Sequence, residues 1–170
     1  ERRPNFYRDR YDEEIRFFDH EVGRLLDWLA AHEVFAESLV VFTSDHGESL
    51  GEHNYWFTHE ANLYDEEVRV PFVIRYPEQM PRPSAKSLVG HLDFLPSVLD
   101  AFGLPQVPAR GISLIANEIP GERIFPHSLH KPDSPLRWFG VTDDRYRLVI
   151  PSSGPELYDI REDPGEQHNL

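Results

Sequence analysis

The order of two hydrophobic patterns limits the folds that this chain can adopt. In residues 11–31, apolar side chains recur every three or four positions, which places them on one face of a helix and predicts that this face is buried. Residues 38–44, SLVVFTS, follow without polar alternation, as in a strand that is covered on both faces. A helix followed by such a strand predicts an α/β fold in which the strand belongs to a mainly parallel sheet flanked by helices.

A second strand and a second helix extend this pattern. Residues 68–77, VRVPFVIRYP, are another apolar run, and Pro71 predicts an irregular start because proline cannot donate a ladder hydrogen bond. Further on, Asp93 is the expected N-cap of a short helix, with Pro96 in its first turn and Gly103 at its end. We assign residues 1–118 to one α/β unit.

The sequence pattern changes after residue 119. Short strand-like runs such as RWFGVTDD, YRLVI and ELYDI are separated by Pro, Gly, Asp and Ser residues, and VTDDRYRLV is typical of a hairpin. Residues 119–170 are therefore predicted to form a small C-terminal antiparallel β subdomain.

Charge and cysteine content exclude several kinds of function. Lys and Arg number 17 against 30 Asp and Glu, a net charge of −13, which argues against nucleic acid as the main partner. The absence of cysteine excludes disulfides and thiolate metal sites. No apolar run approaches the roughly 18 residues that a membrane span needs, so no span is expected.

Ligand-type side chains are concentrated directly after the first strand, in VVFTSDHGESLGEHNYWFTHE (residues 40–60). Ligands of α/β sheets bind at the carboxyl ends of strands, where Asp45 and His46 lie. A carboxylate and an imidazole side by side can bind one cation, and Gly47 lets the backbone turn sharply afterwards. The alternative is an Asp45 that caps the next turn beside an exposed His46.

Two further histidines follow in the same segment. His53 and His59 could each donate to an anionic substrate or act as a general acid, because imidazole titrates near neutral pH. The alternative for each is a surface histidine packed beside aromatic rings. The acids of residues 64–70, YDEEVRV, are expected to face solvent or to pair with Arg69.

Four segments, taken in order, resemble the C-terminal part of a sulfatase of the alkaline phosphatase superfamily. They are YDEEIRFFDHEVGRLLDWL, LVVFTSDHGESLGEHNYWFTHEANLYDEEVRVPFVIRYP, VGHLDFLPSVLDAFGLP with GISL, and ELYDIREDPGEQHNL. The resemblance implies an alkaline-phosphatase-like fold. It makes residues 1–118 the C-terminal half of the catalytic α/β domain. It also implies that the complete enzyme hydrolyses a sulfate ester with the help of a metal.

The resemblance also assigns roles to residues. Asp45 and His46 match the family's late pair of metal ligands for a divalent cation, Ca²⁺ in sulfatases and also Mn²⁺ or Zn²⁺ in phosphoester-cleaving relatives. His59 falls near the position of a Lys or His that contacts the sulfate, which implies a catalytic and substrate-binding role. His53 is a candidate for the rim of the substrate site.

One feature of the family is missing from this sequence. It contains no C/S-x-P-S-R motif, from which sulfatases make their formylglycine nucleophile. The resemblance implies that the nucleophile and two early acidic ligands lie on an N-terminal half, so the chain is expected to be a C-terminal fragment that is inactive alone. The implied substrate is a small sulfate ester or a sulfated glycan.

Two alternatives stay open at this point. A phosphomonoester, phosphodiester or phosphonate-ester hydrolase of the same superfamily would use Asp45 and His46 equally well. A non-catalytic binding or assembly module would use them only structurally. A C/S-x-P-S-R motif upstream would discriminate between these possibilities.

Overall fold

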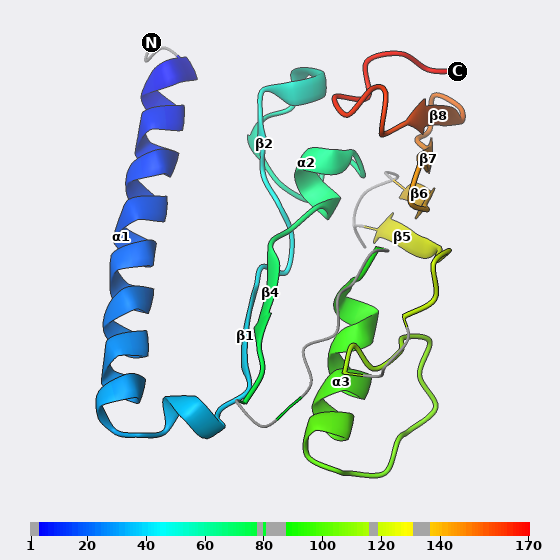
Figure 1. The fold of residues 1–170 in the computed structure, drawn as a ribbon. Coiled ribbons are helices and arrows are strands. Elements are labelled where there is room, and N and C mark those ends of the chain that lie inside the picture. Colours follow the sequence, from blue (N-terminus) through cyan, green and yellow to red (C-terminus); the bar gives the residue numbers. More distant parts are fainter. Residues whose placement is uncertain (1–3, 78–79, 81–87, 116–118, 131–136) are drawn as a thin grey trace.

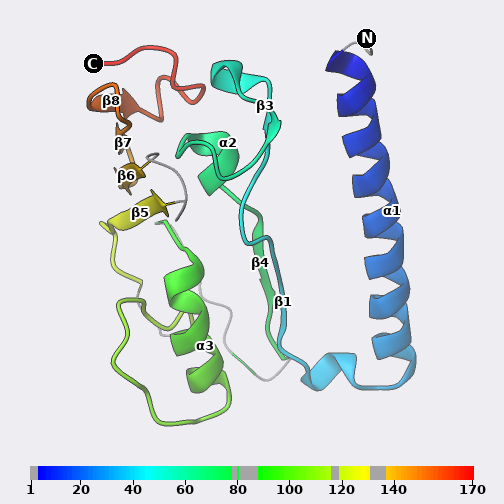
Figure 2. The same ribbon diagram turned by 180° about the vertical axis from the view of Figure 1, so that it is seen from behind.

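The fold was analysed in a computed structural model that describes residues 4–77, 80, 88–115, 119–130 and 137–170. Figure 1 shows a long helix α1 (Pro4–Ala31) beside a ribbon of strands, with a second helix and a small sheet on the other side of the ribbon. The view from behind in Figure 2 gives the same order. The chain thus places its strands between one long helix and the C-terminal elements.

Helix α1 confirms the periodicity of residues 11–31 and begins earlier, at Pro4, where proline is tolerated in a first helical turn. It ends at Ala31, and Glu33 follows in the left-handed region with φ 58°. The expected burial of its apolar face is wrong for this chain, because α1 has no buried residue. Ile15 and Phe18, on that face, are 53% and 57% exposed.

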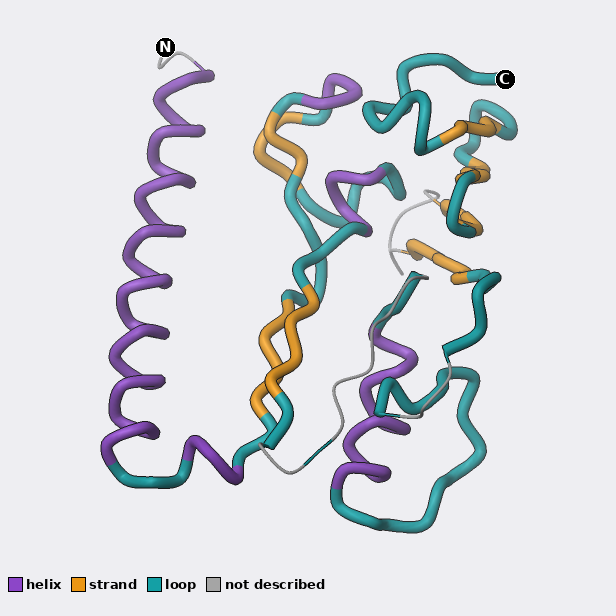
Figure 3. The backbone as a smooth tube through the Cα atoms, viewed as in Figure 1, coloured by secondary structure: helices purple, strands orange, loops and turns teal. Residues whose placement is uncertain are grey.

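The central strands are antiparallel, as Figure 3 traces. Strand β1 (Val40–Thr43) pairs with β4 (Phe72–Arg75), and β2 (Ser49–Leu50) pairs with β3 (Trp56–Thr58). Every strand pair in the part of the chain that the structure describes is antiparallel, so the expected mainly parallel sheet is not seen there. Unalternating apolar strands indicate two covered faces, but they do not fix the direction of the neighbouring strand.

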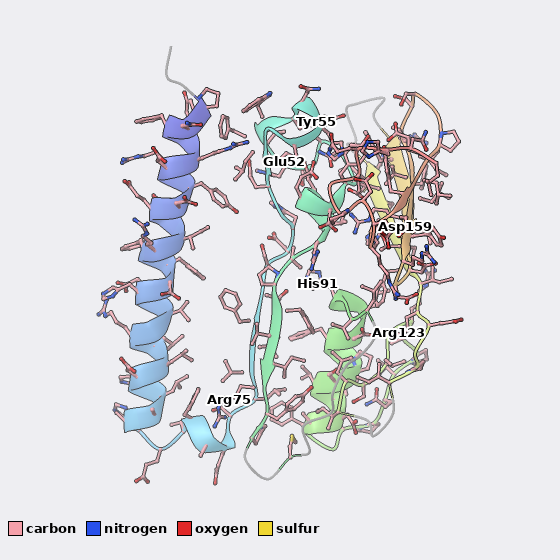
Figure 4. All side chains as sticks on the ribbon, turned by 45° about the horizontal axis from the view of Figure 1, so that its top comes forward. Glu52, Tyr55, Arg75, His91, Arg123 and Asp159 are labelled. Carbon is pink, nitrogen blue, oxygen red and sulfur yellow. The ribbon has the colours of Figure 1, made fainter. Side chains whose placement is uncertain are left out.

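Contacts at the far end of this ribbon connect it to the segment after α1. Arg75 donates hydrogen bonds to the carbonyls of Phe35 and Ser38, and its guanidinium lies 3.9 Å from the centre of the Phe35 ring. Figure 4 labels Arg75 at this end of β4. The ribbon is thus fixed to η1 (Phe35–Glu37), the short 3-10 helix that follows α1.

Helix α3 (Phe94–Ala101) forms where the sequence predicts it, with Pro96 in the first turn and Gly103 after the end at φ 62°. Asp93 does not cap α3 with its side chain. Its carboxylate is fully buried and binds both terminal nitrogens of the Arg123 guanidinium, at 2.7 and 2.6 Å. Asp93 is thus the N-cap residue of α3, as predicted, but its side chain forms a buried ion pair and no cap hydrogen bond.

The C-terminal sheet has four antiparallel strands in sequential order, β5-β6-β7-β8, which confirms the predicted antiparallel subdomain. The predicted hairpin is the β6-β7 pair. The expected boundary after residue 118 adjoins residues 116–118, which lie outside the described residues. The strands are β5 (Phe125–His130), β6 (Arg137–Thr142), β7 (Tyr146–Ile150) and β8 (Glu156–Asp159).

The main core joins this sheet to the segment before β4. Trp138, Val149 and Tyr158 of the sheet pack with Leu63 and Tyr64. Those two residues directly precede α2 (Asp65–Val68), which is therefore held against the sheet. Among the described residues, no helix is both long and apolar enough to cross a membrane.

Candidate active site

Asp45 and His46 lie on a turn directly after β1, as the sequence predicts for a strand end. We call residues 44–47 the cation turn. The side chain of Asp45 is 87% exposed and that of His46 is 40% exposed. Hydrogen bonds from its own and the next backbone N–H, together with the nearby His46, lower the pKa of Asp45. The turn thus presents an ionised carboxylate and an imidazole to their surroundings.

The ring of His46 is oriented by one backbone hydrogen bond. Its Nδ1 lies 2.8 Å from the Gly47 carbonyl oxygen, and because a carbonyl only accepts, Nδ1 carries the proton. The other nitrogen, Nε2, lies 3.8 Å from Asp45 Oδ2. A histidine that donates its remote N–H to a carbonyl is the usual arrangement of a metal ligand.

These two side chains fit a divalent cation. Ligand atoms 3.8 Å apart can both reach one ion over bonds of about 2.0–2.6 Å. Within the described ranges, however, no three His, Cys, Asp or Glu side chains cluster closely enough to hold a metal. The cation turn can therefore offer two ligands, fewer than a protein cation site normally uses.

A cavity of about 640 Å³ opens beside the cation turn. Asp45 and His46 line it together with residues of α2, the segment before α3, and the C-terminal sheet. On the wall contributed by the sheet, His127 bonds Thr142 Oγ1 at 3.1 Å. Burial, with a contribution from the charge of Arg147, lowers the pKa of His127 to about 4, so this part of the wall is a neutral imidazole at physiological pH.

His59 lies directly against His46. The two rings stack with their centres 4.6 Å apart and their planes inclined by 19°. His59 Nδ1 lies 3.1 Å from the Glu48 carboxylate, which orients the ring as Gly47 orients His46. The structure thus brings His59 to the pair that the sequence singles out. Its side chain is 51% exposed, and its role at a substrate stays a prediction.

His53 is placed differently. Its side chain is only 13% exposed, with Nδ1 at 3.1 Å from Glu66 Oε1 and Nε2 at 3.0 Å from the carbonyl oxygen of Glu166. The ring also stacks on Tyr64, with centres 3.7 Å apart. Burial works against its charged form, but the bonds to Glu66 and to the Glu166 carbonyl prevail and raise the pKa of His53. Both nitrogens are occupied by protein, and a substrate contact stays a prediction.

A buried polar cluster behind the turn was missed by sequence reasoning. Glu67 is 5% exposed, although the acids of residues 64–70 were expected to face solvent or to pair with Arg69. Its Oε1 accepts bonds from Ser49 Oγ at 3.1 Å and from Asn62 Nδ2 at 3.2 Å. Burial raises the pKa of Glu67, while the bond from Ser49 opposes the change. Ser49 and Asn62 lie 18 and 5 residues from Glu67 in sequence, and no local sequence pattern predicts these hydrogen bonds.

A second unpredicted contact holds the end of β1. His91 Nε2 lies 3.0 Å from Thr43 Oγ1, and His91 also lines the cavity. Figure 4 labels His91, which precedes α3. Next to it, Ser44 Oγ donates to the carbonyl of His46 at 2.7 Å. One side-chain hydrogen bond therefore holds the residue before the cation turn, and another closes the turn from within.

Comparisons with known proteins agree on one family. The model of the Sulfatase family matches residues 3–104. An uncharacterized sulfatase of Escherichia coli, YidJ, is 34% identical over 91% of this chain and 32% of its own length. An N-acetylglucosamine-6-O-sulfatase of Bacteroides thetaiotaomicron is 32% identical over 89% of this chain and 30% of its own. The chain thus spans about a third of the length of the curated relatives it matches.

A solved structure carries the same fold. It is BT4656 in complex with its substrate D-glucosamine-2-N,6-O-disulfate, with a TM-score of 0.71 and 28% identity over 89% of this chain and 33% of that one. By sequence and by fold, the chain belongs to the sulfatase family.

Proposed function

We propose that the protein containing this chain hydrolyses a sulfate ester, with one water consumed and an alcohol and sulfate released. Asp45 and His46 supply two ligands to a divalent cation, Ca²⁺ by preference and Mn²⁺ or Zn²⁺ as alternatives. The observation that carries the proposal is His46, whose Nδ1 is bound to the Gly47 carbonyl so that Nε2 lies 3.8 Å from the Asp45 carboxylate. Membership of the sulfatase family supports the choice of sulfur chemistry.

The bound cation would neutralise negative charge that develops on the ester oxygens. The remaining ligands and the formylglycine nucleophile are assigned to parts of the protein outside this chain. In this proposal, Asp45 and His46 hold the cation, and His59 helps to orient the imidazole of His46. Asp45 contributes the anionic ligand, His46 the neutral one, and the ring stacking with His59 restricts the orientation of both imidazoles.

His59 is the proposed contact to the sulfate or to the departing oxygen. Its Nδ1 donates to Glu48, so Nε2 is the atom that gives a proton or a hydrogen bond when the ring is in its protonated, imidazolium form. His53 is a weaker candidate for the rim, because protein groups occupy both of its nitrogens. Relatives named for an N-acetylglucosamine sulfate and for choline sulfate support a small sulfate ester or a sulfated glycan as substrate.

The test is made on the full-length protein. We expect Asp45→Ala to lower the cation content and to reduce hydrolysis of an aryl sulfate at least about 100-fold, with Asp45→Asn intermediate. Asp27→Ala, exposed on α1 away from the face of Ile15, is the matched control and should behave as wild type. An unchanged cation content in Asp45→Ala would contradict the ligand assignment.

The same preparation separates the sulfatase from a phosphoester hydrolase. An aryl phosphate is offered beside the aryl sulfate under identical conditions. Faster turnover of the phosphate would favour the phosphoryl-transfer alternative. Retained cation with no turnover of either ester, or of a panel of sulfated sugars, would favour a binding module.

A further inference from the structure

One carboxylate of the C-terminal tail (residues 161–170) is buried inside the protein. Glu166 is 1% exposed and its Oε2 accepts the backbone N–H of Asp65 at 2.7 Å. Its Oε1 lies 3.2 Å from Arg147 Nη1. The backbone of Glu166 is in the left-handed region at φ 52°, a conformation that non-glycine residues adopt only where the surroundings impose it.

A second residue with left-handed backbone meets Glu166. His53 has φ 50° and donates from Nε2 to the Glu166 carbonyl oxygen at 3.0 Å. From Nδ1 it reaches Glu66 Oε1 at 3.1 Å. Glu166 therefore binds the first residue of α2 directly and the second through His53. It joins segments that are 101 and 113 residues away in sequence.

Arg147 completes this cluster from the C-terminal sheet. Its guanidinium is 4% exposed, with Nη2 at 2.8 Å from Asp65 Oδ1 and Nε at 3.0 Å from Thr142 Oγ1. Buried ion pairs are weak sources of stability because desolvation offsets their attraction, whereas they fix geometry well. The cluster thus defines where α2 lies against the sheet.

Helix α2 in turn supports the cation turn. The Gly47 N–H donates to the Glu67 carbonyl at 2.8 Å. The approach is so close that a β-carbon on Gly47 would lie 1.9 Å from the carbonyl oxygen of Glu66. A displacement of α2 by a fraction of an ångström would therefore move the backbone between Asp45 and β2.

From these contacts we propose that Glu166 is a positioning residue, which through α2 holds the cation turn in the conformation that binds the divalent cation. The cation part of this inference rests on the proposed function. The positioning part rests only on the contacts from Glu166 to α2 and from α2 to Gly47.

The experiment compares Glu166→Ala and Glu166→Gln in the full-length protein, with Glu162→Ala as a control on an exposed carboxylate of the same tail. Hydrogen exchange is measured in EDTA on the peptide that contains the Gly47 amide. We expect about tenfold faster exchange in Glu166→Ala. Glu166→Gln should show a smaller increase, because its amide oxygen still accepts from Asp65 while the charge facing Arg147 is lost.

Calcium affinity is then measured by titration of the same proteins. We expect a loss of 10- to 100-fold in Glu166→Ala, as is usual when support of a ligand is removed. A purely structural tail would lower the unfolding temperature and leave the affinity unchanged. If Glu166→Ala does not fold, Glu166→Gln tests the proposal instead, and its calcium affinity is expected to fall by at least about threefold.

The two proposals fail in different ways. Wild-type exchange at Gly47 in both variants overturns the positioning role, whatever binds the cation. Unchanged calcium affinity in both overturns it as well, provided that Asp45→Ala has lost the cation. An Asp45→Ala protein that keeps its cation overturns the proposed function, and the exchange result then decides whether Glu166 fixes the turn.

Discussion

Gly47 shows how a single residue without a side chain determines the geometry of the site. The cation turn and α2 are so close that there is no room for a β-carbon between them. The same contact carries the hydrogen bond from the Gly47 N–H to the Glu67 carbonyl. The sequence predicts a sharp turn here, and the structure adds that the constraint is steric.

We expect Gly47→Ala to lower the free energy of unfolding of the full-length protein by about 1–3 kcal/mol, because the added methyl group displaces α2. Cation affinity should fall with it. Gly23→Ala is the matched control, since a β-carbon there meets nothing within 4 Å. That change lies within α1 and should stabilise by about 0.5–1 kcal/mol. Urea unfolding of both variants checks the difference, and equal effects would contradict it.

His127 gives a prediction about pH. Burial and the charge of Arg147 lower the pKa of His127 to about 4, below its ordinary value of 6.5. A group with a depressed pKa of this kind stabilises the fold above about pH 6.5 and loses that contribution as the pH falls toward 4. The reason is that the unfolded chain binds the proton more tightly than the folded one.

From pH 7 to pH 5 we expect wild type to lose about 1 kcal/mol more than His127→Gln, whose amide can still bond Thr142. The full shift corresponds to roughly 3 kcal/mol. Of this, about 2 kcal/mol falls between pH 7 and pH 5, and solvent screening of a partly buried ring reduces it. Urea unfolding of the full-length proteins at both pH values is the measurement. Parallel pH profiles would contradict the assignment.

At the scale of elements, α1 differs from the rest of the fold. Figures 1 and 2 show it standing beside the ribbon, and its described contacts to the β2-β3 hairpin include Arg8 to the Leu50 carbonyl and the ring of Tyr7 against Phe57. Its apolar face follows a regular helical spacing and is nevertheless exposed. Because the relatives are about three times as long, we infer that other parts of the full-length protein cover this face.

This inference predicts a contrast between two sides of α1. Ile15→Asp should destabilise the full-length protein by about 3 kcal/mol or more, because it buries an unpaired charge. His20→Asp, on the opposite side of the helix, should cost less than about 0.5 kcal/mol. Thermal unfolding compares the two variants, and similar midpoints would show that the face of Ile15 stays in water.

Local patterns predicted α1, α3, the strands β1 and β4, the C-terminal antiparallel sheet, and the strand end that carries Asp45 and His46. They did so because helix and strand periodicities are properties of neighbouring residues. The direction of β4 against β1 and the burial of Glu67 were not predicted. Both features depend on how segments of the chain pack in three dimensions. The residues that bond Glu67, Ser49 and Asn62, lie outside its own helix α2. For the same reason the contact between His53 and the carbonyl of Glu166, 113 residues distant, was not predicted.

For the whole molecule, the two-ligand cation turn sets an expectation about activity. Residues 1–170 expressed alone should hydrolyse an aryl sulfate no faster than buffer, since the described residues hold no cluster of three metal ligands. The full-length protein assayed beside it should be active. Turnover by the isolated chain that disappears in Asp45→Ala would contradict this expectation and place a sufficient site within these residues.

The long-range contacts of the tail also bear on the order of folding during synthesis. A ribosome releases Asp45 and His46 long before Glu166, which follows Asp65 by 101 residues. Domains form from the N-terminal side as the chain emerges, so the cation turn is made early and receives its support late. If Glu166 holds the turn as proposed, the nascent chain passes through a period in which Asp45 and His46 lie on a loosely held loop, until the tail docks.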